Sequence, residues 1–95
     1  MEDRNLEKAA FILRTIAHPV RLAIIDELTK NNQVAVTEIC KLLNMEQSVV
    51  SHHLINMKLK GLLKSQKAGQ QVLYSLKEHN LIQVINCVNN CNCTM

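Results

Sequence analysis

The sequence has few of the residues that build common ligand sites. Phe11 and Tyr74 are its only aromatic residues, which argues against a base-stacking platform and against an aromatic-lined cofactor pocket. Gly61 and Gly69 are its only glycines, too few for a glycine-rich phosphate loop. Neither a Cys-x-x-Cys pair nor an HExxH spacing is present, so the usual motifs of a thiol oxidoreductase or a metalloprotease are missing. We therefore predict a protein that is not an enzyme.

Long apolar runs are missing as well. The apolar stretches FIL and LAII are broken by Arg14, His18 and Arg21, which excludes a secretory signal core and a membrane span. We expect a soluble, cytoplasmic chain whose thiols stay reduced. The length of 95 residues predicts a single domain, residues 1–95, whose core needs neither a disulfide nor a metal.

Positive charge is concentrated in the middle of the chain. The formal net charge is +3, and residues 31–70 hold all of the excess. In that segment Glu38 and Glu46 are outnumbered by Lys41, Lys58, Lys60, Lys64 and Lys67. Localised positive charge is expected for a protein that binds a polyanion such as nucleic acid. A solvated lysine-rich face would produce the same pattern.

Apolar spacing and helix breakers predict four helices in the first two thirds of the chain, at residues 5–17, 19–30, 36–43 and 47–60. Pro19 separates the first two, and Gly61 ends the fourth. Asn44 stands where a left-handed helix end is expected, followed by a short turn. Two short helices around a tight turn are typical of a helix-turn-helix. Its second helix should bury Val50, Leu54 and Met57 and expose its first turn.

Two strand-like runs follow, around Ala68-Gly69, and residues 77–90 return to helical spacing. The predicted fold is mostly α with a small β-hairpin: a winged helix-turn-helix with four helices, two strands and a final helix. Apolar faces on the first and last helices favour a homodimer through those two helices.

Residues 44–76, NMEQSVVSHHLINMKLKGLLKSQKAGQQVLYSL, resemble the ArsR/SmtB family of winged-helix bacterial repressors. Family members commonly read SQSTVSHHL, then a GLV-type strand and a basic wing that ends YYSL. EQSVVSHHL, KGLL and VLYSL match these motifs, and IAHPVRLAIIDEL matches the family's AHPTRLRIL helix. The resemblance covers nearly all of residues 10–76. It implies a homodimeric repressor that binds double-stranded operator DNA.

The start of the fourth predicted helix holds the candidate base-reading residues, because helix-turn-helix proteins insert that part of the second helix into the major groove. Gln47 can form two hydrogen bonds with adenine, and Ser48, Ser51 and His52 are short donors or acceptors. His53 is expected to face the body of the protein. An ordinary pair of surface histidines is the alternative interpretation of His52 and His53.

Lysines are better suited to phosphates, which supply affinity without sequence information. The candidates are Lys58, Lys60, Lys64 and Lys67. Gln70 and Gln71, at the tip of the hairpin, could approach the DNA backbone or the minor groove.

Cys87, Cys91 and Cys93 form a CxxxCxC pattern near the end of the chain. In a helix that reaches Cys91, the β-carbons of Cys87 and Cys91 would lie roughly 5 to 6 Å apart, and Cys93 could fold back towards them. Three thiolates suit a thiophilic ion; arsenite is favoured, Cu(I) also fits, and zinc would want a fourth ligand. An oxidant is another candidate signal. A frayed tail whose thiols have no role is the opposing interpretation.

The sensing sites that the resemblance implies are incomplete. Arsenic and cadmium sensors carry a CVCxxC-like run, whereas residues 35–40, AVTEIC, keep only Cys40, which we expect in the core. Redox sensors place a cysteine where this chain has Asp26. At the positions of an inter-subunit zinc site stand Glu78, Asn80, Cys91 and Thr94.

The prediction is therefore a repressor that needs no cofactor and is released from DNA by a thiol-directed signal. A winged-helix module for protein contact or dimerisation, or a repressor without metal sensing, are the alternatives. DNA binding through phosphates would weaken steeply with salt, and a protein-contact module would not show this.

Overall fold

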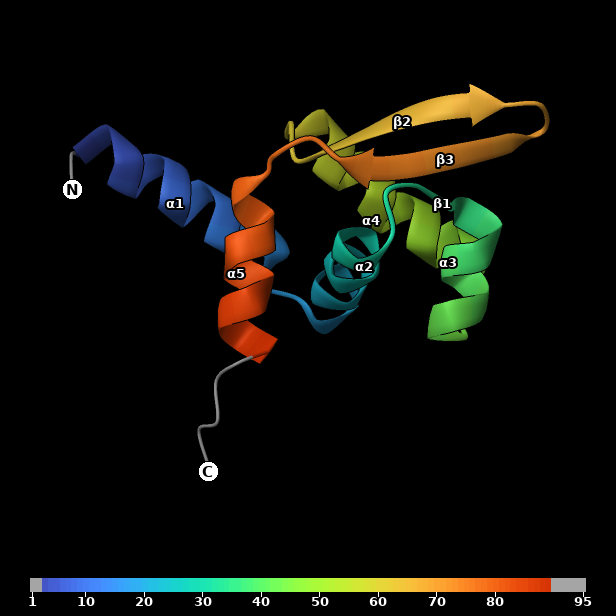
Figure 1. Ribbon diagram of the computed structural model, residues 1–95, viewed down its shortest axis with the longest axis horizontal. Helices are drawn as coiled ribbons and strands as arrows, with labels where there is room; N and C mark the ends of the chain where they lie inside the picture. The colour runs from blue at the N-terminus through green and yellow to red at the C-terminus, as the bar shows by residue number, and fades with distance from the viewer. Residues whose placement is uncertain (1–2, 90–95) are drawn as a thin grey trace.

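The computed structural model describes the backbone of residues 3–89 and the side chains of residues 6–88. Within that part of the chain, five helices and a three-stranded antiparallel sheet build the fold (Figure 1). The helices are α1 (Asp3–Ile16), α2 (Pro19–Lys30), α3 (Val36–Leu43), α4 (Gln47–Leu59) and α5 (Asn80–Asn89). The strands are β1 (Val34–Ala35), β2 (Leu63–Ala68) and β3 (Gln71–Leu76). The predicted winged helix-turn-helix is confirmed, and none of the described helices is long and apolar enough to cross a membrane.

The break between α1 and α2 lies at His18-Pro19, as predicted. A residue that precedes proline is forced out of the helical region, and His18 has an extended backbone with φ −158° and ψ 129°. Nδ1 of His18 accepts a hydrogen bond from the N–H of Val20 at 3.1 Å. Pro19 occupies the first helical position, where a backbone N–H is not needed.

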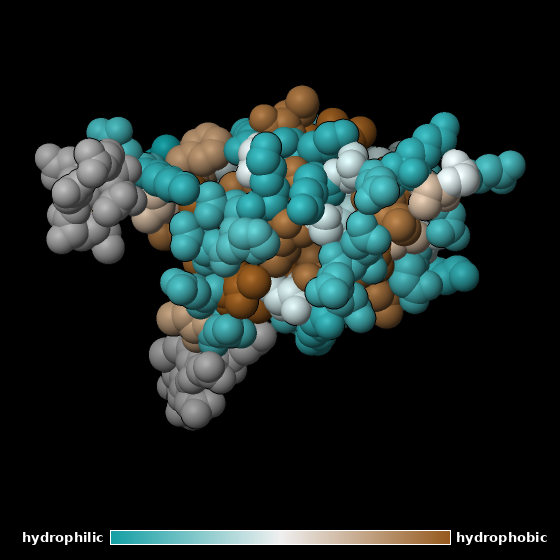
Figure 2. Space-filling view, turned by 45° about the horizontal axis from the view of Figure 1, so that its top comes forward, coloured by the Kyte–Doolittle hydropathy of each residue, from teal (hydrophilic) through white to brown (hydrophobic). Residues whose placement is uncertain are grey.

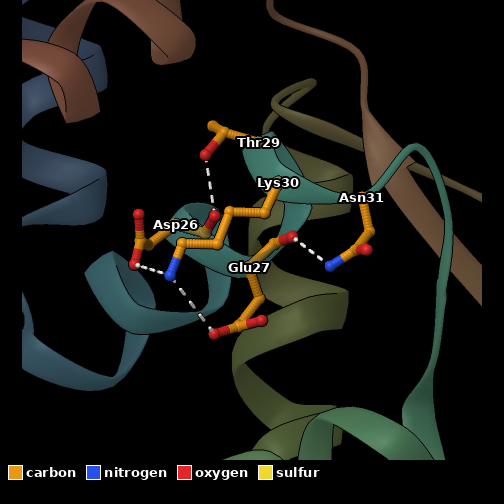
Figure 3. Close-up of polar contacts among 5 residues, drawn as sticks. All are labelled: Asp26, Glu27, Thr29, Lys30 and Asn31. Atoms are coloured by element: carbon orange, nitrogen blue, oxygen red, sulfur yellow. Dashed lines mark hydrogen bonds and ion pairs between the residues drawn. The ribbon is translucent and has the colours of Figure 1, made fainter.

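Polar contacts close the other end of α2 (Figure 3). Asn31 donates from its backbone N–H to the carbonyl oxygen of Glu27 at 3.1 Å, and from its side chain at 3.3 Å. The hydroxyl of Thr29 donates to the carbonyl oxygen of Asp26 at 2.7 Å. Lys30 forms ion pairs with the carboxylates of Asp26 and Glu27 at 3.3 and 3.9 Å. The bonds from Asn31 serve the carbonyl group of Glu27, which has no partner inside the helix.

The sequence did not predict strand β1. Its two residues pair with β3, with Val34 opposite Tyr74 and Ala35 opposite Leu73, and the sheet order is β1-β3-β2. A strand of two residues is too short to show an alternating pattern, so its pairing with the distant β3 is its only signature. β2 and β3 form the predicted hairpin, with the turn at Gly69 in the left-handed region at φ +64°.

The helix-turn-helix forms as predicted. Asn44 ends α3 in the left-handed conformation, with φ 53° and ψ 50°, and its N–H donates to the carbonyl oxygen of Lys41 at 3.2 Å. Val50, Leu54 and Met57 of α4 are fully buried. Gly61 follows α4 with φ +83°. The chain can therefore turn from α4 directly into β2.

The apolar core lies between α2, α3, α4 and the sheet, and α1 and α5 add to it from one side (Figure 1). From α1 it receives Ile12 and Ile16, whereas Leu6 and Leu13 are 51% and 52% exposed. Both leucines belong, with Ile16, to the helical apolar spacing by which residues 5–17 predict a helix. Since α1 extends away from the other helices, only a narrow side of it meets the core. Its second apolar stripe, which contains Leu6 and Leu13, stays exposed.

We predict that Asn44→Ala lowers the free energy of unfolding by about 1 kcal/mol, because asparagine enters the left-handed region more readily than alanine does. Asn44→Gly should be less damaging, since glycine enters that region freely. Urea denaturation of both variants measures the difference. Asn32→Ala is the control, because among the described non-glycine residues only Asn44 has a positive φ. An Ala variant as stable as the wild type would contradict the prediction.

Candidate nucleic-acid interface

The first two turns of α4 present polar side chains to solvent. Gln47, Ser48 and His52 are exposed, and Ser51 is half-buried. Among these turns Val50 and His53 face inward, with exposed fractions of 0% and 9%. The predicted inward orientation of His53 is therefore confirmed. Glu46 occupies the N-cap position without a side-chain capping bond, so the side chain leaves the first N–H groups of α4 free for an anion.

Gln47 and Ser51 lie at the same groove as the tip of the hairpin. One turn apart on α4, they line a cavity of about 230 Å³ together with Gln70 and Gln71. Thr37 of α3, Ile55 of α4 and Tyr74 of β3 also line it. The fold thus brings the start of α4, the recognition helix of the helix-turn-helix, and the tip of the β2–β3 hairpin, the wing, into one surface. Ser48 and His52 do not line this groove and form the adjoining edge of α4, again one turn apart.

Tyr74 forms the floor between the sheet and α4. Its side chain is 5% exposed, and it lies opposite Ser65 in the β2–β3 pairing. Burial raises the pKa of the Tyr74 phenol above its ordinary value of 10.0, while a hydrogen bond with Ser65 lowers it; the net shift is upward. The phenol therefore stays neutral at physiological pH and adds no negative charge to the groove.

The candidate lysines are all exposed but do not share one face. Lys67 pairs across the hairpin with Val72, which lines the groove. Lys64 pairs instead with Ser75 and lines a separate cavity of about 520 Å³ at the end of α2 and the start of α5. Lys58 lies in the last turn of α4. Figure 2 shows hydrophilic residues extending to the tip of the hairpin.

Arg21 is a residue of this region that the sequence analysis did not select. From α2 it donates a hydrogen bond from Nε to Nδ1 of His53 at 3.0 Å and one from Nη1 to Oδ1 of Asn56 at 2.9 Å. Both acceptors belong to the recognition helix. The matching motif AHPVRL contained Arg21, but its partners lie 32 and 35 positions further along the chain.

Comparison with known proteins identifies the family to which this chain belongs. The profile described as "Bacterial regulatory protein, arsR family" matches residues 18–65. The chain is 38% identical over 89 residues to the transcriptional repressor PagR of Bacillus anthracis, which covers 94% of this chain and 89% of PagR. The chain belongs to the arsR family of bacterial regulatory proteins.

Solved structures agree with this membership. The crystal structure of PagR superposes with a TM-score of 0.81 and 39% identity, covering 93% of this chain and 100% of that chain. HlyU from Vibrio cholerae superposes with a TM-score of 0.86 and 29% identity, covering 98% and 100%. The arsR family consists of DNA-binding transcriptional regulators, so the prediction that this chain is not an enzyme is confirmed.

The structure of this arsR-family chain describes two of the four cysteines, and neither of these two lines the groove beside α4. Cys40 is half-buried and packs against the core, as predicted. Cys87 is exposed and lines a cavity of about 740 Å³ between α1 and α5. Cys91 and Cys93 lie outside the described residues. Among the residues that the structure describes, no group of three or more His, Cys, Asp or Glu side chains could hold a metal ion.

Other positions of the family's sensing sites have structural roles here. Asp26 pairs with Lys30 at the end of α2 (Figure 3). Glu78 accepts a hydrogen bond from the N–H of Asn80 at 3.3 Å and forms an ion pair with Lys8 at 3.2 Å. Glu78 therefore caps α5 and ties it to α1. Burial raises the pKa of Glu78, but the hydrogen bonds and charge supplied by Lys8 and Asn80 outweigh burial and leave the pKa below 4.5.

We predict that Glu78→Gln lowers the free energy of unfolding at pH 7 by up to about 1 kcal/mol, the range of exposed ion pairs. Because the folded pKa of Glu78 is depressed, its charge stabilises the fold above pH 4.5, and this contribution is lost as the pH falls through the lowered pKa. Denaturation at pH 7 and pH 3 measures both values, with the exposed Glu7→Gln as control. A difference that persists at pH 3 would contradict the prediction.

Proposed function

We propose that this arsR-family chain is a homodimeric repressor that binds a specific double-stranded operator. The observation that carries the proposal is the exposed start of α4 beside the hairpin, with Gln47 and Gln70 lining the same groove. A surface of this shape fits a helix in the major groove with the wing on the neighbouring backbone. The similarity to PagR, named a transcriptional repressor, supports repression.

The exposed side chains of α4 supply the sequence specificity in this proposal. Gln47 can form two hydrogen bonds with an adenine edge, and Ser48, Ser51 and His52 bond to neighbouring bases. Lys67, on the groove side of the hairpin, and Lys58 bind phosphates. Lys64 is on the other face of the hairpin from Lys67, so it contacts the DNA backbone only where the duplex extends to that face.

The exposed apolar side chains of α1 and α5 support a dimer through those helices. They are Leu6, Phe11, Leu13, Ile82 and Val88, between 37% and 52% exposed. Leu13 and Val88 line one cavity between α1 and α5, and an apolar surface shared by two helices favours pairing with an identical copy. A two-fold dimer would present its two α4 helices roughly 34 Å apart, matching successive major grooves.

Release from DNA is proposed to follow a thiol-directed signal at Cys87, Cys91 and Cys93, with arsenite as the favoured inducer. The position of Cys87, exposed beside the α1–α5 cavity, supports this, because a ligand there would alter the helices proposed to form the dimer. Changing the dimer geometry moves the two α4 helices apart or together. Such coupling is typically worth about 1 to 3 kcal/mol.

The first test compares Gln47→Ala with Lys67→Ala on an operator selected from random DNA. Gln47→Ala should lose about 1 to 3 kcal/mol of discrimination at one base pair. Lys67→Ala should weaken binding to all sequences and reduce the slope of log affinity against log salt by about 0.9. Fluorescence anisotropy at several salt concentrations measures both effects.

The control for this test is Lys77→Ala, which removes one exposed positive charge outside α4 and the hairpin. It should change affinity less than Lys67→Ala. Weak wild-type binding with little salt dependence would instead favour a protein-contact module.

The second test titrates arsenite into the complex of protein and operator. The wild type should release DNA, and Cys87→Ser should not respond, because one of three thiolates is lost. Cys40→Ser is the matched control and should respond like the wild type, since Cys40 packs against the core. An unchanged response of Cys87→Ser would exclude the three cysteines as the inducer site.

A further inference from the structure

The guanidinium of Arg21 binds groups from two other helices. Besides His53 and Asn56 of α4, its Nη1 also donates to the carbonyl oxygen of Thr15 in α1 at 2.9 Å. Thr15 lies in the last turn of α1, so this carbonyl has no partner inside its own helix. The guanidinium therefore joins the end of α1 to the recognition helix, although it belongs to α2.

The hydrogen bond from Arg21 fixes the protonation state of His53. Nε of arginine can only donate, so Nδ1 of His53 must be unprotonated and the proton of the neutral ring must be on Nε2. A second proton would have to enter at Nδ1. There it would face the Nε–H of Arg21, and the hydrogen bond would become a contact between two donors and two positive charges.

Few neighbours could compensate a positive charge on His53. The titratable groups that face it are Arg21 from α2, His18 from the link between α1 and α2, and His52 from α4. The ring centroids of His18 and His52 lie 4.7 and 5.7 Å from that of His53. None of these groups can carry a negative charge, and the His53 side chain has little access to water.

We propose that Arg21 is a positioning residue for the recognition helix, and that its hydrogen bond to neutral His53 makes DNA binding sensitive to protons. This inference rests on the proposed function, because it requires that α4 bind DNA. His53 is adjacent to His52 on α4. Loss of the bond would let the middle of α4 shift against α1 and α2, and the exposed face of α4 would shift with it.

The pH range follows from the surroundings of His53. Burial lowers the pKa of His53 below 6.5, and the charge of Arg21, with those of protonated His18 and His52, lowers it further. The unfolded chain therefore takes up this proton more readily than the folded chain. The contribution of His53 to the free energy of unfolding is complete above pH 6.5 and is lost as the pH falls through the lowered pKa.

The direction of the effect distinguishes it from ordinary charge. Protonation of an exposed histidine beside DNA adds a positive charge and strengthens binding at low pH. Protonation of His53 weakens binding, because it breaks one of the two hydrogen bonds by which Arg21 positions α4. A decrease in affinity on acidification therefore reports on His53.

The experiment measures operator affinity by fluorescence anisotropy between pH 7.5 and 5.5 at constant ionic strength. The wild type should bind the operator at least roughly fivefold more weakly at pH 5.5 than at pH 7.5. A change of about fivefold is the lower end of the range that is typical of coupling between two sites. His53→Asn places an amide oxygen near the position of Nδ1, where it can accept from Arg21 without titrating. Its affinity should not decrease on acidification. His79→Asn, at an exposed histidine outside this cluster, should keep the wild-type decrease.

Two further measurements separate positioning from folding. Arg21→Lys keeps the charge but loses the forked geometry, so it should weaken operator binding at pH 7.5 and abolish the decrease at low pH. Circular dichroism and urea denaturation establish that the variants compared are folded. Nitrogen-15 NMR of the wild-type histidines without DNA should show His53 unprotonated at Nδ1 at pH 7.5.

A His53 protonated at Nδ1 at pH 7.5 would overturn the inference, as would identical pH profiles for the wild type and His53→Asn. Both results would leave the repressor proposal intact. Absence of operator binding at every pH would overturn the proposed function, and this inference with it.

Discussion

The burial of one face of α4 is the constraint on which the interface depends. Val50, Leu54 and Met57 are fully buried, and together they fix the rotation of the helix about its axis. With about 3.6 residues per turn, that rotation also decides which side chains face outward. Gln47 and Ser51 reach the groove because Val50 and Leu54, on the adjoining side of the helix, are locked in the core. Removing the buried side chains would therefore damage the interface as well as the stability.

Polar contacts, in addition to the apolar face, hold α4 and the terminal helices in position. Arg21 links the recognition helix to the end of α1, and Glu78 links α1 to the start of α5 through Lys8. These polar contacts connect the surface proposed to bind DNA with the surface proposed to form the dimer, in addition to the apolar core that both share. A polar contact of this kind can be broken by the binding of one ligand or one proton. Regulation of such a fold does not require the core to rearrange.

The two cysteines that the structure describes have different surroundings. Cys40 packs against the core, where a thiol behaves as a small apolar group. Cys87 is exposed on α5 at the cavity beside α1. Other positions at which relatives could hold a sensing residue serve the fold in this chain: Asp26 pairs with Lys30, and Glu78 caps α5. A thiol-based signal therefore fits the end of α5 better than α2 or α3.

The elements could be predicted where a local rule set them. Pro19 separates α1 from α2, Asn44 and Gly61 bound the two helices of the helix-turn-helix, and Gly69 turns the hairpin. Each acts on the backbone within a few residues, so its effect is visible in the sequence. The inward orientation of His53 was predictable for the same reason, because helical spacing places it beside Val50 and Leu54.

Contacts between distant segments were not predictable. The pairing of β1 with β3, the burial of Ile12 rather than Leu13, and the bond of Arg21 to His53 all depend on how the elements pack. Strand alternation puts Lys64 and Lys67 on opposite faces of the hairpin, but only the packing decides that the face of Lys67 adjoins the groove. A linear pattern records which residues share a face. It does not record what that face meets, since the partner comes from another part of the chain.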